Sequence, residues 1–277
     1  MRAIDSHQHF WEYDPAEYPW IKAEWPIRKS FLPADLEPLL RRCGFNGCVA
    51  VQARQSLRES EWLLELAEKS SIIAGVVGWA DLRSAEVAKQ LERFAGKPKF
   101  VAVRHVVQDE PDDQFMLRED FLRGIAALKQ FDLAYDILIF PKQLPAAIEL
   151  ARRFPEQRFV LDHIAKPFIK DSVIEPWATQ IRELAKAQNV FCKLSGMVTE
   201  ARWQTWSAAD FRPYLDVVWQ AFGADRLMIG SDWPVCLLSG EYERTIGMVQ
   251  RYLEQFGAAE REKVLGANAV RFYRLPS

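Results

Sequence analysis

Long apolar runs and basic clusters are both missing from this chain of 277 residues. No apolar stretch approaches the roughly 20 residues that a membrane-spanning helix needs. Lys and Arg number 36 against 38 Asp and Glu, which gives a net charge of -2, and no basic run is interleaved with aromatic residues. Nucleic acid and membranes are therefore not expected as partners. Met1 and Arg2 lead directly into an apolar segment without a signal-peptide core, so we expect a cytoplasmic protein.

The usual cysteine and serine signatures are also absent. The cysteines are Cys43, Cys48, Cys192 and Cys236, which show no C-x-x-C spacing and lie in or beside apolar runs, as reduced core thiols do. Disulfides are not expected. Cys236 follows Asp232 by four residues, and we interpret it as a packing residue because nothing nearby in the sequence depresses its pKa. There is no G-x-S-x-G motif, which disfavours a serine acyl-enzyme.

The chain does contain a repeated alternation of β-prone apolar runs and amphipathic helical periods. We predict strands at residues 3–7, 47–52, 73–79, 100–103, 134–139, 159–161, 190–194 and 227–230. Strands rich in Val and Ile that alternate with helices indicate a parallel sheet. Eight such units favour an α/β fold with a single (β/α)8 TIM barrel over residues 1–277. The last helices are predicted at 242–256 and 259–273.

A long irregular segment, residues 10–33, follows the first predicted strand and is rich in Trp, Tyr and Pro. Loops longer than about 12–15 residues are uncommon in compact domains and are usually functional. We interpret this segment as an active-site loop, with packing over one end of the barrel as the alternative.

His7 and His9 stand at the end of the first predicted strand. Side chains alternate between the two faces of a strand, so these imidazoles point to the same side. Such a pair suits a divalent metal such as zinc, or an acid/base pair; two unrelated surface histidines are the alternative. The last predicted strand leads into Asp232, which we expect at the same barrel face.

Polar residues follow the other predicted strands as well, and barrels of this type build their sites at the C-terminal strand ends. The chain has four histidines, and all of them fall at these ends. The residues there are His7, His9, Gln52, Arg54, Trp79, Asp81, Arg104, His105, Asp136, Asp162, His163, Lys166, Lys193, Ser195, Ser231, Asp232 and Trp233. For His105, a place on the rim is an equally good interpretation.

The motifs His7-Gln8-His9, Asp162-His163 and Gly230-Ser231-Asp232-Trp233-Pro234 resemble those of the amidohydrolase superfamily. The closer resemblance is to its branch of metal-dependent hydrolases, which contains 2-pyrone-4,6-dicarboxylate lactonase and the L-fuconolactonases and L-rhamnonolactonases. Segments 5–11, 51–54, 77–79 and 193–196 are similar to that group as well. The resemblance covers essentially the whole chain and implies an amidohydrolase-type barrel.

We hypothesise that His7 and His9 either hold a divalent metal, with Asp232 as a further ligand, or polarise the substrate carbonyl directly. Binuclear members of the superfamily bridge two metals with a carboxylated Lys or a Glu from strand four and add a His from strand five. Here strand four ends in Arg104-His105 and strand five carries Asp136. We therefore expect at most one divalent metal, zinc or manganese. Some lactonases of the branch work without a metal, so metal-independent catalysis stays an alternative.

Hydrolysis of a lactone requires an activated water, a group that polarises the ester carbonyl, and a proton for the leaving alkoxide. We hypothesise that Asp232 is the general base. Without a metal, His163, Arg104 or His105 would stabilise the oxyanion. His163 could also protonate the departing ring oxygen.

The predicted substrate-binding residues are Trp11, Gln52, Arg54, Trp79, Lys166, Lys193 and Trp233. Tryptophan faces suit sugar C–H groups, and the polar side chains suit hydroxyl groups. We predict an uncharged sugar lactone as the small-molecule partner, such as L-fucono-, L-galactono- or L-rhamnonolactone. The Arg and Lys side chains would also attract a dicarboxylate, and the tryptophans could instead pack the barrel.

Two alternatives to the lactonase remain. The first is a zinc-dependent decarboxylase of the same superfamily. The second is a catalytically inactive barrel that binds a sugar acid, which the missing metal ligands on strands four and five would favour. We expect a monomer or a homodimer.

Overall fold

The computed structural model describes residues 2–276, in which eight strands form one sheet in the order β1 to β8. Every pair of hydrogen-bonded neighbours is parallel. The strands are β1 (Ile4–Gln8), β2 (Gly47–Val51), β3 (Ile73–Gly78), β4 (Phe100–Val106), β5 (Ala134–Leu138), β6 (Phe159–Leu161), β7 (Val190–Leu194) and β8 (Leu227–Ile229). All the predicted strands are confirmed, with small shifts at their ends.

Hydrogen bonds between β1 and the segment after β8 close the sheet into a barrel. The backbone amide of Asp232 donates to the carbonyl of His7 at 2.8 Å, and that of His9 donates to the carbonyl of Trp233 at 2.6 Å. The predicted TIM barrel is therefore confirmed. This seam also brings His7 and His9, near the start of the chain, into direct contact with Asp232, near its end.

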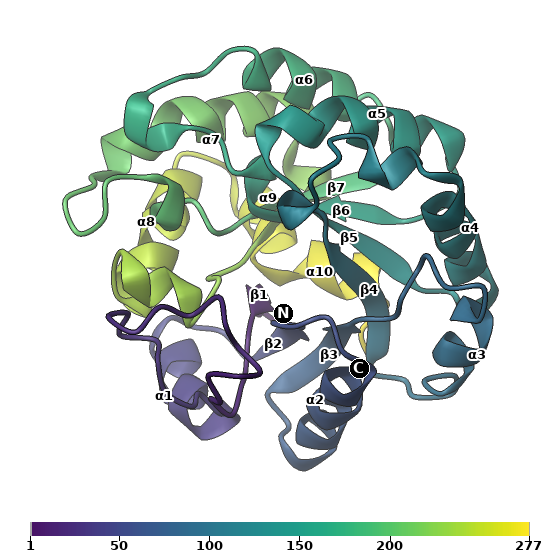
Figure 1. The fold of residues 1–277 in the computed structure, drawn as a ribbon. Coiled ribbons are helices and arrows are strands. Elements are labelled where there is room, and N and C mark those ends of the chain that lie inside the picture. Colours follow the sequence, from purple (N-terminus) through teal and green to yellow (C-terminus); the bar gives the residue numbers. More distant parts are fainter. Residues whose placement is uncertain (1, 277) are drawn as a thin grey trace.

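Helices follow the strands and surround the barrel, as Figure 1 shows. They are α1 (Pro33–Arg42), α2 (Leu57–Lys69), α3 (Val87–Glu92), α4 (Glu119–Leu128), α5 (Leu144–Arg153), α6 (Trp177–Leu184), α7 (Ala208–Phe222) and α8 (Tyr242–Leu253). The final segment contains α9 (Ala258–Glu262), a π-helical turn (Lys263–Ala267) and α10 (Asn268–Tyr273). Within the described part of the chain, no helix is long and apolar enough to cross a bilayer.

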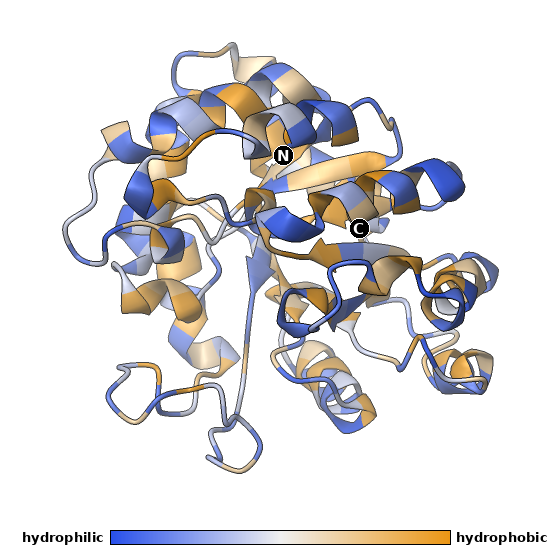
Figure 2. Cartoon of the chain, turned by 45° about the horizontal axis from the view of Figure 1, so that its top comes forward, coloured by the Kyte–Doolittle hydropathy of each residue, from blue (hydrophilic) through white to orange (hydrophobic). Residues whose placement is uncertain are grey.

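Two hydrophobic clusters form the core. The larger one fills the space between the strands and the surrounding helices. The smaller one joins strand residues such as Val49 and Val160 to Phe272 and Tyr273 of α10. Figure 2 shows hydrophobic residues concentrated on the strands, whereas the helices carry both hydrophobic and hydrophilic residues, as amphipathic helices do. The end of the barrel opposite the strand C-termini is thus closed by α10.

The predicted irregular loop between β1 and α1 is pinned at its base. Trp11 and Phe31 exchange two backbone hydrogen bonds of 2.9 and 3.0 Å. The Trp11 side chain is fully buried, and its Nε1 donates to the carbonyl of Lys29 at 2.8 Å. The loop therefore has a packed base, which leaves the residues between Trp11 and Lys29 to extend over the barrel.

Gly124 provides a test of how tightly α4 packs. A Cβ at this position would overlap the carbonyl oxygen of Leu82, which is backbone and cannot swing away. We expect Gly124→Ala to lower the free energy of unfolding by about 2 kcal/mol, as overpacked positions do. The measurement is chemical denaturation of the variant and the wild type.

Gly247→Ala in α8 is the matched control. Its Cβ would meet only the flexible Arg251 side chain, at 3.2 Å, and alanine raises helix propensity by up to about 1 kcal/mol. We expect this variant to be as stable as the wild type or slightly more stable. Equal stability of the two variants would show that α4 has room to move away from Leu82.

Candidate active site

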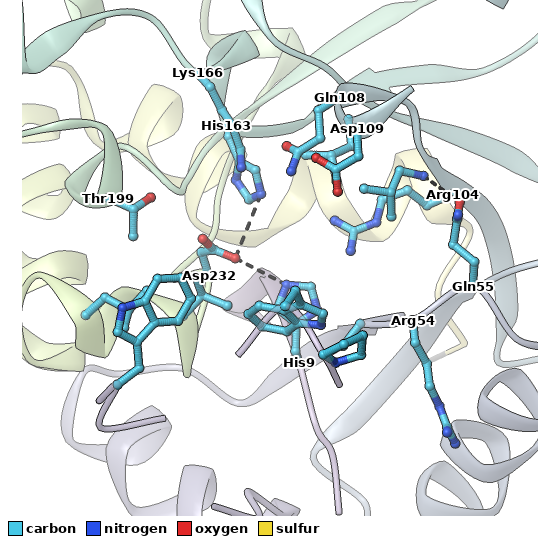
Figure 3. Close-up of a pocket in the computed structure, with 18 of the residues that line it drawn as sticks. His9, Arg54, Gln55, Arg104, Gln108, Asp109, His163, Lys166, Thr199 and Asp232 are labelled. Carbon is cyan, nitrogen blue, oxygen red and sulfur yellow. Dashed lines mark hydrogen bonds and ion pairs between the residues drawn. The ribbon is translucent and has the colours of Figure 1, made fainter. Parts of the chain in front are cut away.

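A cavity of about 640 Å³ opens at the C-terminal ends of the strands. Its lining includes His9, which follows β1, Arg104 at the end of β4, His163 after β6 and Asp232 after β8. Figure 3 shows Asp232 between His9 and His163, with Arg104 to one side. The seam and the strand ends thus bring together four residues that the sequence singled out.

His9 and Asp232 form the closest contact in this group. Nδ1 of His9 donates to the carbonyl of Val51 at 2.8 Å, which leaves the lone pair of Nε2 facing the cavity in the neutral ring. Nε2 lies 3.2 Å from Oδ1 of Asp232 and 3.3 Å from Nε2 of His7. Three donor atoms with lone pairs therefore converge on one point.

His163 reaches the cavity through a left-handed turn, η5 (Asp162–Ala165). His163, Ile164, Ala165 and Lys166 all have φ between 48° and 60°, a region that costs residues with a side chain about 1–2 kcal/mol each. Gly196 allows this arrangement, because a Cβ there would overlap the His163 ring. Such strain is typical of functional sites.

Contacts on both sides hold the His163 ring. Its Nδ1 lies 2.9 Å from Oγ of Ser195, and its Nε2 lies 3.8 Å from Oδ1 of Asp232. Asp232 also has a positive φ, 57°. Both members of the pair are therefore presented by strained backbone at the barrel mouth.

A layer of buried charges lies beneath these residues. Lys193 is fully buried, with its Nζ 2.6 Å from Oδ2 of Asp136 and 3.0 Å from Oδ1 of Asp162. The hydroxyl of Tyr273 donates to Asp136 at 2.7 Å. Nδ1 of His7 lies 3.3 Å from Asp162 and 3.1 Å from Lys193. Lys193, which we predicted to bind substrate, is instead committed to this layer and does not line the cavity.

Burial and pairing set the protonation states. Burial lowers the pKa of His7 and of His163 well below the usual value, so both rings are neutral at pH 7. Burial alone would raise the pKa of Asp232, but the neighbouring His163 and His9 rings outweigh it and lower the pKa. Burial raises the pKa of Asp136 to about 6 against the influence of Lys193. Asp232 is therefore ionised at neutral pH.

The residues present fit one divalent metal. Nε2 of His7, Nε2 of His9 and Oδ1 of Asp232 are separated by 3.2, 3.3 and 3.8 Å. Ligands about 2.0–2.1 Å from a tetrahedral zinc lie about 3.4 Å apart. A second donor group comprises His7, Asp162 and His163. There Asp162 already contacts two cations, Lys193 and Arg104, which oppose a second metal ion.

Arg104 is held by Gln52 and Asp162. Its Nε and Nη2 donate to Oε1 of Gln52 at 2.9 and 2.7 Å, and its Nη1 donates to Asp162 at 3.2 Å. Gln52 is fully buried and does not line the cavity. We predicted that Gln52 binds substrate. In the structure it instead supports Arg104 from beside the cavity.

His105, which we predicted to act in catalysis, lies outside the cavity. Adjacent residues on β4 face opposite sides, so His105 points away from the barrel interior when Arg104 points into it. Its ring stacks on Phe115 with centroids 5.0 Å apart, and its Nε2 contacts Glu110 at 2.7 Å. His105 does not line the cavity; its partner Glu110 does.

The aromatic wall of the cavity is made of other tryptophans than we predicted. Trp11 and Trp233 are buried against Phe31, and neither they nor Trp79 line the cavity. The tryptophans that line it are Trp20, Trp25 and Trp203. Trp20 and Trp25 belong to the loop that we predicted to be an active-site loop, whereas Trp11 of the same loop does not line the cavity.

Polar cavity residues were missed as well. The lining includes Gln55, Gln108, Asp109, Thr199 and Glu200. Gln108 and Asp109 lie on the turn η1 (Val107–Asp109) directly after β4, and Thr199 and Glu200 lie on η7 (Val198–Glu200) after β7. Both pairs follow the end of a strand within a few residues. That position was the sequence signal by which they could have been found. Of the predicted cationic residues, Lys166 and Arg54 do line the cavity.

Arg54 ties the first loop to the barrel. It forms an ion pair with Glu17 and lies over the ring of Tyr18, 5.3 Å from the centroid. Beneath it, the buried Glu59 accepts hydrogen bonds from the amides of Ala53 and Arg54 at 3.1 and 2.9 Å and from the hydroxyl of Tyr18 at 3.3 Å. In Figure 3 the Arg54 side chain points away from Asp232. Its guanidinium therefore anchors the loop.

The chain is similar to known proteins over nearly its whole length. The family model described as "Amidohydrolase" matches residues 4–275. An L-fucono-1,5-lactonase of Burkholderia multivorans is 43% identical, covering 99% of this chain and 96% of the relative. A second L-fucono-1,5-lactonase, from Burkholderia ambifaria, is 39% identical over 98% and 95%. A crystal structure of an amidohydrolase from Burkholderia multivorans with bound zinc superimposes with a TM-score of 0.95, at 43% identity over 100% of both chains.

The buried charge layer predicts that Lys193 is required for stability. Lys193→Met would leave Asp136 and Asp162 without their shared cation, and breaking a buried pair in this way costs about 3–5 kcal/mol. We expect a loss of this size in the free energy of unfolding, measured by chemical denaturation. Lys166→Met, which removes a cation from the cavity wall, is the control and should change stability by less than about 1 kcal/mol. Equal effects would argue against the structural role of Lys193.

The burial of Glu59 leads us to expect that the stability of the protein depends on pH. Burial raises the pKa of Glu59 from 4.5 to about 7, so the folded state favours the protonated acid. The contribution of Glu59 to the free energy of unfolding is fully present below pH 4.5 and is lost as the pH rises through 7. The loss amounts to about 3 kcal/mol. We expect Glu59→Gln to remove this dependence, as measured by denaturation between pH 4.5 and 8.

Glu61, whose side chain is 43% exposed, provides the control for this series. It pairs with Arg93 on the surface, so Glu61→Gln should keep the pH profile of the wild type. If Glu59→Gln also kept that profile, Glu59 would have to be ionised in the folded protein over the whole range.

Proposed function

Because the chain belongs to the amidohydrolase family, we propose that it is a carboxylic ester hydrolase that opens a sugar lactone to the free aldonic acid. The observation that carries this proposal is the convergence of Asp232, His9, His163 and Arg104 at the bottom of one cavity. The similarity to two L-fucono-1,5-lactonases supports it. On that basis we propose L-fuconolactone, or a lactone of related shape such as L-galactono- or L-rhamnonolactone, as the substrate.

Asp232 has the properties of the general base. Its carboxylate is ionised at neutral pH and is 4% exposed, so it is shielded from bulk solvent. It accepts a proton from a water molecule as the water oxygen bonds to the lactone carbonyl carbon. Arg104 lines the same cavity and can donate a hydrogen bond to the carbonyl oxygen as negative charge develops on it.

His163 completes the proton transfer. The neutral ring, 3.8 Å from Asp232, can take up the proton from Asp232 and pass it to the ring oxygen as the bond between carbonyl carbon and ring oxygen breaks. The leaving alkoxide becomes a hydroxyl group, and the new carboxylic acid releases its proton to solvent. Acid release is therefore the direct readout of the reaction.

We propose that His7, His9 and Asp232 hold one divalent ion, zinc or manganese, when a metal is bound. Such an ion would supply Lewis acidity and lower the pKa of a bound water. The bound zinc of the Burkholderia multivorans structure supports zinc as the first candidate. Arg104 and Lys193 beside Asp162 favour a single ion over two.

The test is a pH-indicator assay with a panel of aldonolactones led by L-fucono-, L-galactono- and L-rhamnonolactone. Metal-stripped, zinc-loaded and manganese-loaded enzyme are compared. We expect Asp232→Asn to reduce kcat/KM by at least about 100-fold, because a positioned general base contributes about 10²–10⁴ in rate. Asp225→Asn, whose surface carboxylate pairs with Lys263 at 2.7 Å, should match the wild type.

Other outcomes identify the alternatives. Acid release from no lactone at any metal loading would contradict the proposal. Release of CO₂ from an aromatic or sugar acid with a strict metal requirement would establish the decarboxylase. A thermal shift with sugar acids but no turnover would establish the inactive binding barrel.

A further inference from the structure

The charged side chains of the cavity wall are nearly all paired with other protein groups. Glu17 pairs with Arg54, Glu110 with His105 at 2.7 Å, and Glu200 with Lys166 at 4.0 Å. These pairs include two of the three cations that line the cavity, and the third, Arg104, contacts Asp162 at 3.2 Å. Among the described residues, the wall therefore presents no Lys or Arg that is free of an acidic partner.

Asp109 is the exception among the acids. Asp109 is exposed and lines the cavity, and its carboxylate makes no side-chain hydrogen bond and no ion pair within residues 2–276. Figure 3 shows it above the space between His163 and Arg104. The free charge on the cavity wall is thus negative.

Gln108, the preceding residue, carries a second group without a partner. Its Oε1 is buried and accepts no hydrogen bond from the described part of the protein. Figure 3 places the Gln108 side chain next to Asp109, on the side of His163. A buried amide oxygen without a donor is costly, so a donor from a bound molecule would satisfy it.

The two groups share one chemistry. A carboxylate and an amide oxygen accept hydrogen bonds, and a carboxylate accepts them from two neighbouring hydroxyl groups at once. The same carboxylate repels a substrate that carries a carboxylate of its own. We infer that Gln108 and Asp109 determine specificity, by binding hydroxyl groups of a neutral polyhydroxylated lactone and disfavouring lactones that carry an acid group. This inference rests on the proposed lactonase function.

The first experiment compares two lactones of the same skeleton. Galactono-1,4-lactone carries a neutral hydroxymethyl group where galactaro-1,4-lactone carries a carboxylate. We expect the wild type to favour the neutral lactone by at least about tenfold in kcat/KM, and Asp109→Asn to remove most of this preference. The preference of the wild type should also fall as salt is raised from 0.05 to 0.5 M, because salt screens the repulsion.

Gln108→Ala tests the role of the Gln108 amide oxygen as a hydrogen-bond acceptor for the substrate. We expect it to raise KM for the neutral lactone about tenfold, with kcat within about twofold of the wild type, because the lost contact does not touch the reacting bond. The matched control is Asp112→Asn, which removes the same charge from the same loop outside the cavity and should leave KM, kcat and the preference unchanged.

Binding of neutral L-fucose by calorimetry separates this inference from the proposed function. Weaker binding to Gln108→Ala and Asp109→Asn than to the wild type and Asp112→Asn supports the inference even if no lactone is turned over. Equal binding to all four overturns it. Turnover of lactones with the same preference in Asp109→Asn as in the wild type also overturns it, while the lactonase function would stand.

Discussion

The ion pair of Lys193 with Asp136 and Asp162 is the constraint on which the site depends. Removing an ammonium group and two carboxylates from water costs several kcal/mol for each ion, and close contacts must offset that cost. The contacts of 2.6 and 3.0 Å require β5, β7 and the turn after β6 to keep fixed positions. Tyr273 of α10 completes the layer from below. The closed end of the barrel is thus linked directly to the end that carries the cavity.

Asp162 passes this constraint to the groups at the cavity. It contacts His7 and Arg104 through its two oxygens and begins the left-handed turn that carries His163. Gln52 holds Arg104 from the other side. The bottom of the cavity is therefore built from strand ends whose side chains are fixed by buried polar contacts. The walls come from loops, where Trp20 is 38% exposed and Asp109 is exposed as well.

The strands and the residues at their ends could be predicted because both are local properties. Apolar runs separated by helical periods identify each βα unit, and residues such as His9 and Asp232 follow directly on those runs. The direction of a side chain near a strand end was harder to predict. Arg104 and His105 are neighbours in the sequence and lie on opposite faces of β4, and only the register of the sheet shows which one faces the interior.

The sequence by itself determined the eight-stranded barrel and the polar residues that directly follow its strands, such as His9 and Asp232, because periodicity and chain order suffice for both. The tertiary structure decided which of those residues face the cavity and which neutralise one another. Lys193 looked available for a substrate and is instead buried between two carboxylates, and Trp11 is covered by its own loop. The physical reason is that burial and ion pairing depend on distances between strands far apart in the chain, which no local pattern contains.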